Sequence, residues 1–590
     1  MPLSRLLPLF LLLLATTCAP PPVRRNVLLI SIDTLRWDRL GSTGHAGAAT
    51  PNLDRLAASG TLFTNGVAPT PLTLPSHATM FTGKLPIEHG VRDNAPFRLP
   101  ERHDTLTTTF AERGYRTAAV VGAAPLAAGC GLERDFETYD DDFGAQATGT
   151  VVLAERRADA VTDAAIERLA VDDERPFFLF VHYFDPHAPY APPAPFAADF
   201  AGAPYDGEVA FVDREIGRLL TALDRSGAAA ETLVVVTSDH GEALGEHGED
   251  AHGFFLYDCT IRVPVIVRDP GAPAGGVEET QVRHQDLRAF VEARAADRPA
   301  DLAAPGRRGE PAFVESLYGA IHCDHAQLRG LRSPRGTKLL EACDVEFYDL
   351  GADPDEEQDL APGDPRVAPA LAALDGALDS LRRDRSEGGG AALPGYLSTP
   401  LAPELLATRS REENCARPSP ASRRASIAAL QDGVRQLEAG LLQSACETLG
   451  AGVADDPENP ALRFWHGRAL RAAAAQDGDR ERLVEAERAF ADVVRLRPDH
   501  AQARDLRLHS LVLLGRYDEA KRLADALAAG DPAPRSLEAA AILHLTPRGA
   551  FAEADNPHHD PAAAAALLER ALEAGEDARI RARLEECYRR

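Results

Sequence analysis

From Asn26 to about Leu360, short apolar runs alternate with helical segments, and this alternation constrains the fold more than any other feature of the chain. The run Val27–Ser31 is almost wholly apolar, as expected of a strand that is covered on both faces. The same signature recurs at Thr117–Val121, Phe177–His182, Leu233–Thr237 and Val263–Val267, with amphipathic stretches between them at Val151–Leu169 and Val209–Leu223. The pattern predicts an α/β fold in which a large, mostly parallel or mixed central sheet is sandwiched by helices. Residues 300–360 are expected to form a smaller subdomain within a unit that spans 26–385.

The last 165 residues, 426–590, change to a composition rich in Ala, Leu, Arg and Glu with helical spacing. Three X-Pro pairs, which begin at Asp456, Arg497 and Asp531, each precede an Ala/Leu-rich helical segment at intervals of 41 and 34 residues. A period of 34 residues indicates stacked helix pairs, and Leu514–Ala520 is similar to the tetratricopeptide pattern. We therefore predict an all-α repeat domain, with a generic helical bundle as the alternative. The Gly- and Pro-rich segment 386–425 is expected to be a linker.

The first 25 residues have the features of an export signal. Arg5 precedes a ten-residue apolar run, Leu6–Ala15, which is too short to span a bilayer but suits the central part of a signal peptide. The run leads into Cys18, and the segment resembles a bacterial lipobox in which that cysteine is lipidated. We expect an exported protein of the bacterial cell envelope that is lipid-anchored on the periplasmic or outer-membrane side. Secretion without lipid and an uncleaved anchor remain the alternatives.

Charge excludes one class of partner. Lys and Arg number 63 against 90 Asp and Glu, which leaves a net charge of −27 over 590 residues. Nucleic-acid binding requires clustered cations for the phosphates, so we expect no nucleic-acid partner. An anionic substrate would have to be held by a metal ion or by local donors. The eight cysteines are too sparse for a disulfide scaffold.

Candidate metal ligands follow two of the predicted strands. Asp33 comes directly after the first strand, and Asp239 and His240 come directly after the strand Leu233–Thr237. Ligand sites in open α/β sheets lie at the carboxyl ends of the strands. Carboxylate and imidazole ligands together suit zinc or manganese, while calcium is possible.

Further candidate residues lie in motifs whose order along the chain resembles the sulfatase family of the alkaline phosphatase superfamily. The resemblance covers about Asn26 to Leu360 and includes Thr73-Leu-Pro-Ser-His, TGxxPxxHG at 82–90, the Pro-His-Ala-Pro segment 186–189, the helix 205–213, Ser-Asp-His-Gly-Glu at 238–242 and Phe-Tyr-Asp-Leu at 347–350. It implies a sulfatase-like fold and an anionic ester substrate.

The resemblance also implies roles for single residues. Asp33, Thr73, Asp239 and His240 would bind a divalent metal ion, and Thr73 would be the nucleophile. His187 and His252 would donate to the substrate anion, with a second-metal role as the alternative for His252. We regard Asp185, His247 and His77 as further candidates for a second metal ion or for substrate.

The sequence departs from the family at the nucleophile. Sulfatases need a Cys or Ser that is converted to formylglycine, whereas this chain has Thr73, so no formylglycine is expected. A formylglycine hydrate expels sulfate by collapsing to the aldehyde, but a threonine ester has to be cleaved by water at the central atom. Phosphorus tolerates that attack, and the superfamily members with a Thr nucleophile are phosphodiesterases, nucleotide pyrophosphatases and phosphoethanolamine transferases.

We therefore expect a metal-dependent hydrolase of the cell envelope that cleaves phosphoric or, less readily, sulfuric esters through a covalent Thr73 intermediate. A transferase that moves a phospho-headgroup, of the phosphoethanolamine type, on the same site is the first alternative. A catalytically silent, tethered interaction protein is the second. In each case the helical repeats are expected to bind a protein or peptide partner on their concave surface.

Overall fold

The computed structural model describes residues 24–94, 97–143, 155–272, 276–303, 309–383, 407–530, 534–574 and 578–589. The predicted export signal with Cys18, the start of the predicted helix Val151–Leu169 and most of the predicted linker lie outside these residues. Among the described residues, no helix is both long and apolar enough to cross a membrane.

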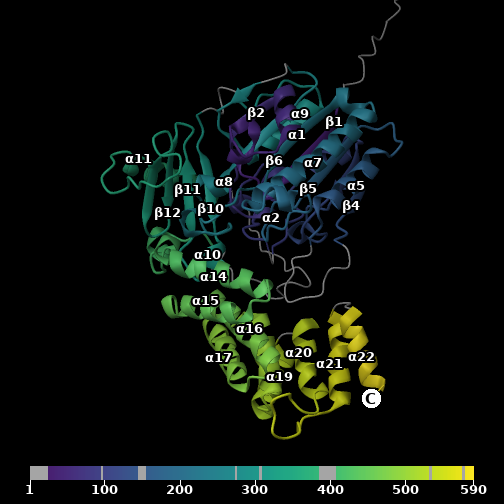
Figure 1. Ribbon diagram of the computed structural model, residues 1–590, viewed down its shortest axis with the longest axis vertical. Helices are drawn as coiled ribbons and strands as arrows, with labels where there is room; N and C mark the ends of the chain where they lie inside the picture. Colours follow the sequence, from purple (N-terminus) through teal and green to yellow (C-terminus); the bar gives the residue numbers. More distant parts are fainter. Residues whose placement is uncertain are drawn as a thin grey trace, which may run out of the picture.

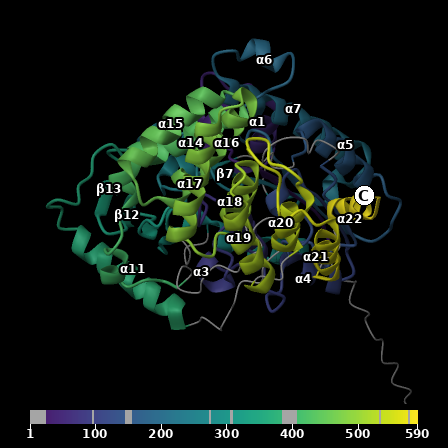
Figure 2. The same ribbon diagram turned by 90° about the horizontal axis from the view of Figure 1, so that it is seen from below.

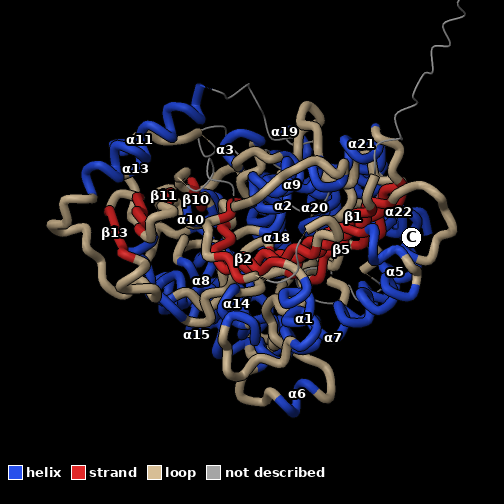
Figure 3. The backbone as a smooth tube through the Cα atoms, turned by 90° about the horizontal axis from the view of Figure 1, so that it is seen from above, coloured by secondary structure: helices blue, strands red, loops and turns tan. Residues whose placement is uncertain are grey.

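A nine-stranded mixed sheet forms the centre of the larger unit (Figures 1 and 3). Its order is β4-β3-β5-β1-β6-β7-β2-β8, and β9 also pairs with β2. Strands β4, β3, β5, β1 and β6 run parallel, whereas β7 is antiparallel to both β6 and β2. The predicted α/β fold with a mixed sheet is thereby confirmed. The strands are β1 Asn26–Ile32, β2 Thr61–Val67, β3 Arg116–Val120, β4 Thr138–Asp140, β5 Phe177–Tyr183, β6 Thr232–Ser238, β7 Arg262–Arg268, β8 Val277–Glu278 and β9 Val282–Arg283.

Helices cover both faces of this sheet. Successive residues of its central strands point to opposite faces, and the residues on both faces are apolar. Val27 and Leu29 of β1 face one core, whereas Leu28 and Ile30 face the other. The first core is closed by α2 Thr73–Thr82, α4 Leu106–Glu112 and α9 His284–Ala295, and the second by α1 Pro51–Ser59, α5 Ala158–Leu169 and α7 Pro204–Arg225. The short helices α3 Pro86–His89, α6 Phe196–Asp199 and α8 Asp258–Ile261 lie in the connections. A strand buried on both faces explains why β1 reads as a continuous apolar run.

A smaller antiparallel sheet lies beside the large one (Figure 1). It consists of β10 Ala312–Ser316, β11 Leu328–Arg332, β12 Thr337–Glu341 and β13 Val345–Asp349, with α10 Tyr318–His322 and α11 Val367–Arg383 packed around it. Lys338 of β12 is wholly buried and forms ion pairs with Asp258 and Glu356, each at 2.7 Å. The pair with Asp258 joins the small sheet to α8, and Glu356 lies in the segment that follows β13.

The C-terminal region contains helices and no strand among its described residues, and it arches below both sheets (Figures 1 and 2). After the short α13 Arg411–Asn414, its helices are α14 Arg424–Glu438, α15 Leu442–Asp455, α16 Pro460–Asp477, α17 Arg480–Leu496, α18 Ala501–Leu513, α19 Tyr517–Gly530, α20 Pro534–Leu545, α21 Pro561–Ala574 and α22 Ala578–Arg589. Helices α16, α18 and α20 begin two or three residues after the X-Pro pairs that predicted them. Each helix packs mainly on its neighbours in sequence.

The end of the predicted linker is packed against the small sheet. Asn414 is wholly buried, where its side-chain amide donates to the carbonyls of Gln327 and Ala342 at 2.9 and 3.1 Å. A disulfide joins Cys415 to Cys343 in the β12–β13 turn. The polar and Pro-rich composition predicts a solvent-exposed segment, but Asn414 satisfies backbone groups at the start of β11 and the end of β12.

Candidate active site

The carboxyl ends of three adjacent parallel strands bring polar side chains together. Asp33 follows β1, Asp239 and His240 follow β6, and His182 is the penultimate residue of β5. In the sheet register, Ser31 lies opposite His182 and Ile32 opposite Ser238, so all these side chains lie at the same edge. The edge is the place where open α/β sheets carry their ligand sites.

Thr73 is the first residue of α2, and its N-terminal helix position faces this edge. Its residue is 2% exposed, and the next amide, that of Leu74, donates to Asn94 Oδ1 at 2.8 Å. One turn later, His77 donates from Nδ1 to the Thr73 carbonyl at 2.7 Å, while its Nε2 lies 2.9 Å from Ser31 Oγ. The helix N-terminus favours negative charge, so the position suits an oxygen that becomes an alkoxide.

Unpartnered ligand atoms converge beside Thr73. His240 Nε2 lies 3.7 Å from Asp33 Oδ1 and 3.5 Å from Asp239 Oδ2, and His182 Nε2 lies 3.5 Å from Asp33 Oδ2. None of these atoms has a hydrogen-bond partner within the described part of the chain, although all four residues are wholly buried. Two groups meet the geometry of a cation site, namely Asp33 with Asp239 and His240, and His77 with His182 and Asp239.

These residues fit a divalent metal ion. His240 donates from Nδ1 to the Gly241 carbonyl at 3.0 Å, which fixes the tautomer that leaves the Nε2 lone pair free for a ligand bond. Burial, followed by the charge of Asp33, raises the pKa of Asp239 to about 7, and burial lowers the pKa of His240 to about 3. Burial likewise raises the pKa of Asp33 well above its ordinary range, which the neighbouring Thr34 amide and Thr73 hydroxyl partly oppose. The ligand oxygens of Asp33 and Asp239 lie within 4.8 Å of each other. Two buried carboxylates at this separation require a cation between them to ionise together.

His187 and His252 form the half-buried side of the site. Their Nε2 atoms are 3.2 Å apart, and the His252 ring centre lies 4.3 Å from that of His240. His187 donates from Nδ1 to the Ala188 carbonyl at 2.7 Å, and His252 donates from Nδ1 to the Pro71 carbonyl at 2.9 Å. Both rings therefore direct Nε2 toward the space beside the metal-ligand group, where a substrate anion can reach them.

Two of the candidate residues lie apart from this group. Asp185 Oδ2 accepts from the Ala158 amide at 2.8 Å at the start of α5, and burial raises the pKa of Asp185 to about 6. His247 lies in the 3₁₀ turn Glu246–Gly248, where its ring stacks on Tyr257 with centres 3.7 Å apart. The Asp185 carboxylate thus binds the first amide of α5 and His247 forms a ring contact in its loop, while His77 bonds to the Thr73 carbonyl one turn along α2.

Two histidines of the site were not among the sequence-based candidates. His182 belongs to a cation group, and its position at the end of a predicted strand was the available signal. His284 begins α9, where Ser76 Oγ lies 3.0 Å from its Nδ1 and its Nε2 has no partner among the described residues. Ser76 also donates to the Asp239 carbonyl at 2.7 Å, so this pair supports the backbone of a proposed ligand.

Comparisons with known proteins show similarity to sulfatases. The sequence profile of the sulfatase family matches residues 25–291. Human arylsulfatase A is 27% identical over 322 residues, which cover 46% of this chain and 63% of that enzyme. Human N-acetylgalactosamine-6-sulfatase is 30% identical over 322 residues, which cover 45% of this chain and 60% of that enzyme. The chain thus matches somewhat less than two thirds of the length of these relatives.

Solved structures show the same fold. The phosphonate monoester hydrolase of Agrobacterium radiobacter is 24% identical with a TM-score of 0.51, and the match covers 61% of this chain and 96% of that one. A protein solved in complex with its substrate D-glucosamine-2-N,6-O-disulfate is 21% identical with a TM-score of 0.52, and the match covers 62% of this chain and all of that one.

Proposed function

We propose that this chain, whose α/β domain is of the sulfatase family within the alkaline phosphatase superfamily, is a metal-dependent hydrolase that cleaves phosphoric esters, and sulfuric esters less readily, with Thr73 as its nucleophile. The observation that carries the proposal is the position of Thr73 at the N-terminus of α2, beside ligand atoms of Asp33, Asp239 and His240 that have no hydrogen-bond partner among the described residues. The carboxylate and imidazole donors favour zinc or manganese over calcium.

The chemistry follows from the positions of these side chains. A divalent ion held by Asp33, Asp239 and His240 would lower the pKa of the Thr73 hydroxyl and polarise the ester. The Thr73 oxygen then attacks phosphorus, the bond to the leaving oxygen breaks, and that oxygen takes up a proton. Because their Nδ1 protons are used by the Ala188 and Pro71 carbonyls, His187 and His252 would donate from Nε2 to the equatorial oxygens only as imidazolium ions, the form that a bound anion favours. Water finally attacks phosphorus of the threonine ester and returns the hydroxyl proton to Thr73.

Phosphorus is favoured over sulfur because of the second step. An unmodified threonine ester has no route of release other than attack at the central atom, which phosphoric esters tolerate. The alternative on the same site is transfer to an acceptor alcohol, as in a phospho-headgroup transferase, if water is kept from the threonine ester.

Export to the cell envelope is a separate proposal. The Cys343–Cys415 disulfide supports it, since such bonds persist mainly in oxidising compartments. The signal-like sequence that ends at Cys18 supplies an address and a lipid anchor. The tetratricopeptide-like helices would then offer a partner protein or peptide a surface beside the enzyme.

The nucleophile is tested with the full chain. Nitrophenyl esters of phosphate (monoester and diester), phosphonate and sulfate would each be offered with zinc, manganese or calcium. We expect phosphate diester or phosphonate turnover in the parent, a loss of at least about a thousandfold in Thr73→Ala, and measurable turnover in Thr73→Ser, which keeps a hydroxyl at the helix N-terminus.

Metal content and thermal midpoint of both variants serve as the controls. Equal rates in Thr73→Ala and the parent would overturn the nucleophile assignment. Sulfate turnover by the parent would contradict the argument about the second step. A parent that binds metal but turns over no ester would favour the transferase alternative.

A further inference from the structure

The loop that carries His252 is enclosed from outside by the first long helix of the C-terminal region. We define the His252 loop as residues 245–257, between the Ser-Asp-His-Gly-Glu motif and α8. Apolar residues of α14, among them Ile427 and Leu430, belong to the same buried cluster as Phe254 and Phe255 of this loop. The helical region therefore completes a hydrophobic core that the α/β domain alone leaves open.

Arg424, at the start of α14, binds both ends of the loop. Its guanidinium donates to the His247 carbonyl and, at 2.6 Å, to the Tyr257 hydroxyl. The same group lies over the rings of Phe255 and Tyr257, 4.7 and 5.5 Å from their centres. One side chain thus joins residues ten positions apart by hydrogen bonds and cation–π contacts.

Gln431, two turns further along α14, binds the middle of the loop. Its Oε1 accepts from the Asp250 amide at 2.8 Å, and Arg435 on the next turn forms an ion pair with Asp250 at 3.1 Å. Asp250 is two residues from His252. Helix α14 therefore fixes the backbone immediately before the histidine.

The opposite side of the loop contacts the nucleophile segment and the small sheet. His252 donates to the Pro71 carbonyl, two residues before Thr73, and Ser316 donates to the Gly253 carbonyl. The Glu249 carboxylate accepts from the amides of Phe254 and Phe255 at 2.8 and 3.2 Å. These contacts orient the His252 ring, and Arg36 of the α/β domain forms an ion pair with Glu246 at 2.9 Å. Helix α14 adds the contacts to the His247 carbonyl and to Asp250.

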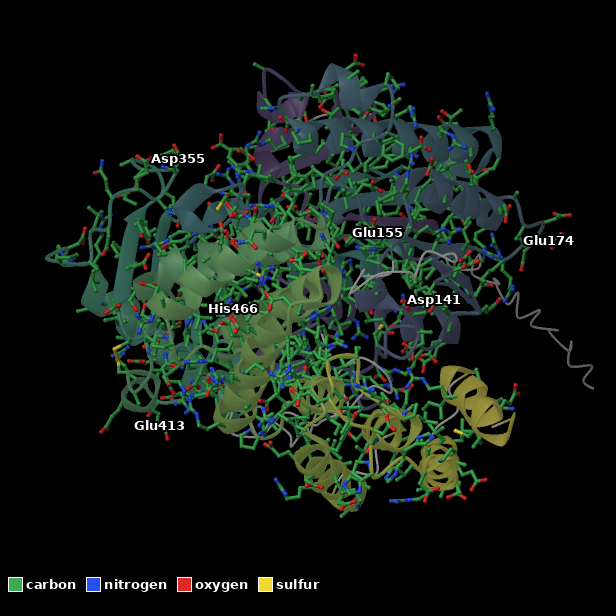
Figure 4. All side chains as sticks on the ribbon, turned by 60° about the horizontal axis from the view of Figure 1, so that its bottom comes forward. Asp141, Glu155, Glu174, Asp355, Glu413 and His466 are labelled. Atoms are coloured by element: carbon green, nitrogen blue, oxygen red, sulfur yellow. A yellow bond between two sulfur atoms is a disulfide. The ribbon has the colours of Figure 1, made fainter. Side chains whose placement is uncertain are left out.

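We infer that α14 is a positioning element of the active site, in which Arg424 and Gln431 hold the His252 loop so that His252 Nε2 stays beside His187 and the metal-ligand group. The inference rests on the proposed function of that site. Figure 4 brings the bottom of the Figure 1 view forward. In it the green helices of the C-terminal region, near the labelled His466 of α16, lie in front of the α/β domain. The C-terminal region is then part of the catalytic unit as well as a surface for a partner.

Kinetics of full-length variants test the inference. Arg424→Ala and Gln431→Ala should each lower kcat/KM for the best nitrophenyl ester by about tenfold or more, because small displacements of a positioned group weaken transition-state contacts. The loss should fall mainly on kcat, with metal content unchanged. Arg424→Lys, which keeps a cation and a donor, should recover part of it.

The matched control is Arg516→Ala. Arg516 has nearly the same side-chain exposure as Arg424, 35% against 34%, and its ion pairs with Glu487 and Glu519 lie within the helical region. We expect this variant to keep the kcat/KM of the parent. Equal kcat/KM per folded molecule in Arg424→Ala, Gln431→Ala and the parent would overturn the inference.

Amide hydrogen exchange separates failure of this inference from failure of the proposed function. Arg424→Ala should raise exchange in residues 246–252 while α2 and β6 keep their protection, and Arg516→Ala should not. If the parent turns over no ester, the proposed function fails, and the exchange pattern still decides whether α14 holds the loop. Unchanged exchange in Arg424→Ala would overturn the inference by itself.

Discussion

Asp33, Asp239 and His240 are wholly buried, yet each directs toward the others an atom that has no hydrogen-bond partner in the described part of the chain. A buried polar group without a partner costs about 1–3 kcal/mol of stability, so three of them at one point are not expected from packing alone. Residues that keep such a cost are typical of functional sites, where a ligand supplies the missing interaction. The same reasoning applies to Nε2 of His182 and His284.

Glu208 of α7, outside the metal-ligand group, is another buried carboxyl group whose burial lowers the stability of the folded state. It is 4% exposed, its Oε1 accepts from the Ala191 amide at 2.6 Å, and its Oε2 has no partner among the described residues. Burial, followed by the charge of Asp185, raises its pKa to about 9. In the unfolded chain a glutamate ionises near pH 4.5, so the folded state loses stability relative to the unfolded state as pH rises between about 4.5 and 9.

Glu208→Gln should remove that dependence, because glutamine keeps the acceptor for Ala191 and carries no titrating proton. The free energy of unfolding of the variant should gain on that of the parent by up to about 1.4 kcal/mol per pH unit across this window. Urea unfolding would be followed by Trp37 fluorescence in a Trp465→Phe background, since the chain has two tryptophans and Trp465 lies in the helical region. Parallel pH profiles for parent and variant would contradict the assignment.

Among the elements, those with a strong apolar run were predictable and the others were not. The strands β1, β3, β5, β6 and β7 follow the runs that predicted them within one residue at each end. β2 was not predicted, since its bulge at Phe63–Gly66 interrupts the run with Thr64 and Asn65. His182 was missed although it ends the predicted run Phe177–His182, because the aromatic residues Tyr183 and Phe184 follow it and periodicity gives no sign of which residue reaches the sheet edge.

The disulfide between the β12–β13 turn and the end of α13 is an element that sequence spacing did not reveal. Cys343 and Cys415 are 72 residues apart, and a closed loop of this length stabilises a folded unit by about 4 kcal/mol. Cys343→Ser with Cys415→Ser should therefore lower the urea midpoint of the parent. Dithiothreitol should lower the midpoint of the parent and leave that of the double variant unchanged. A parent insensitive to the reductant would contradict a stabilising role.

In the whole molecule, the two regions that the sequence separates with a linker share one buried cluster. The apolar periodicity of α14 predicts a buried face but cannot say that its partner is Phe254 and Phe255, which lie about 170 residues earlier. Further contacts join the regions, among them His325 Nε2 to Asp456 Oδ2 at 3.2 Å and Arg497 to the Ile321 carbonyl at 2.6 Å. Contacts between segments this far apart in the chain cannot be read from periodicity or composition, because these patterns describe only local structure.

The proposed metal ion would join three elements that are far apart in the chain, because two of its ligands come directly after β1 and β6 and Thr73 is the first residue of α2. A chelator should therefore abolish turnover and also lower the thermal midpoint, since a ligand at a hundred times its Kd stabilises the folded state by about 2.7 kcal/mol. Zinc or manganese should restore both properties better than calcium. Asp33→Asn removes one ligand charge, so the midpoint of that variant should respond weakly to chelator and metal alike. A parent whose midpoint is unaffected by the chelator, although its metal has been removed, would contradict a structural contribution of the ion.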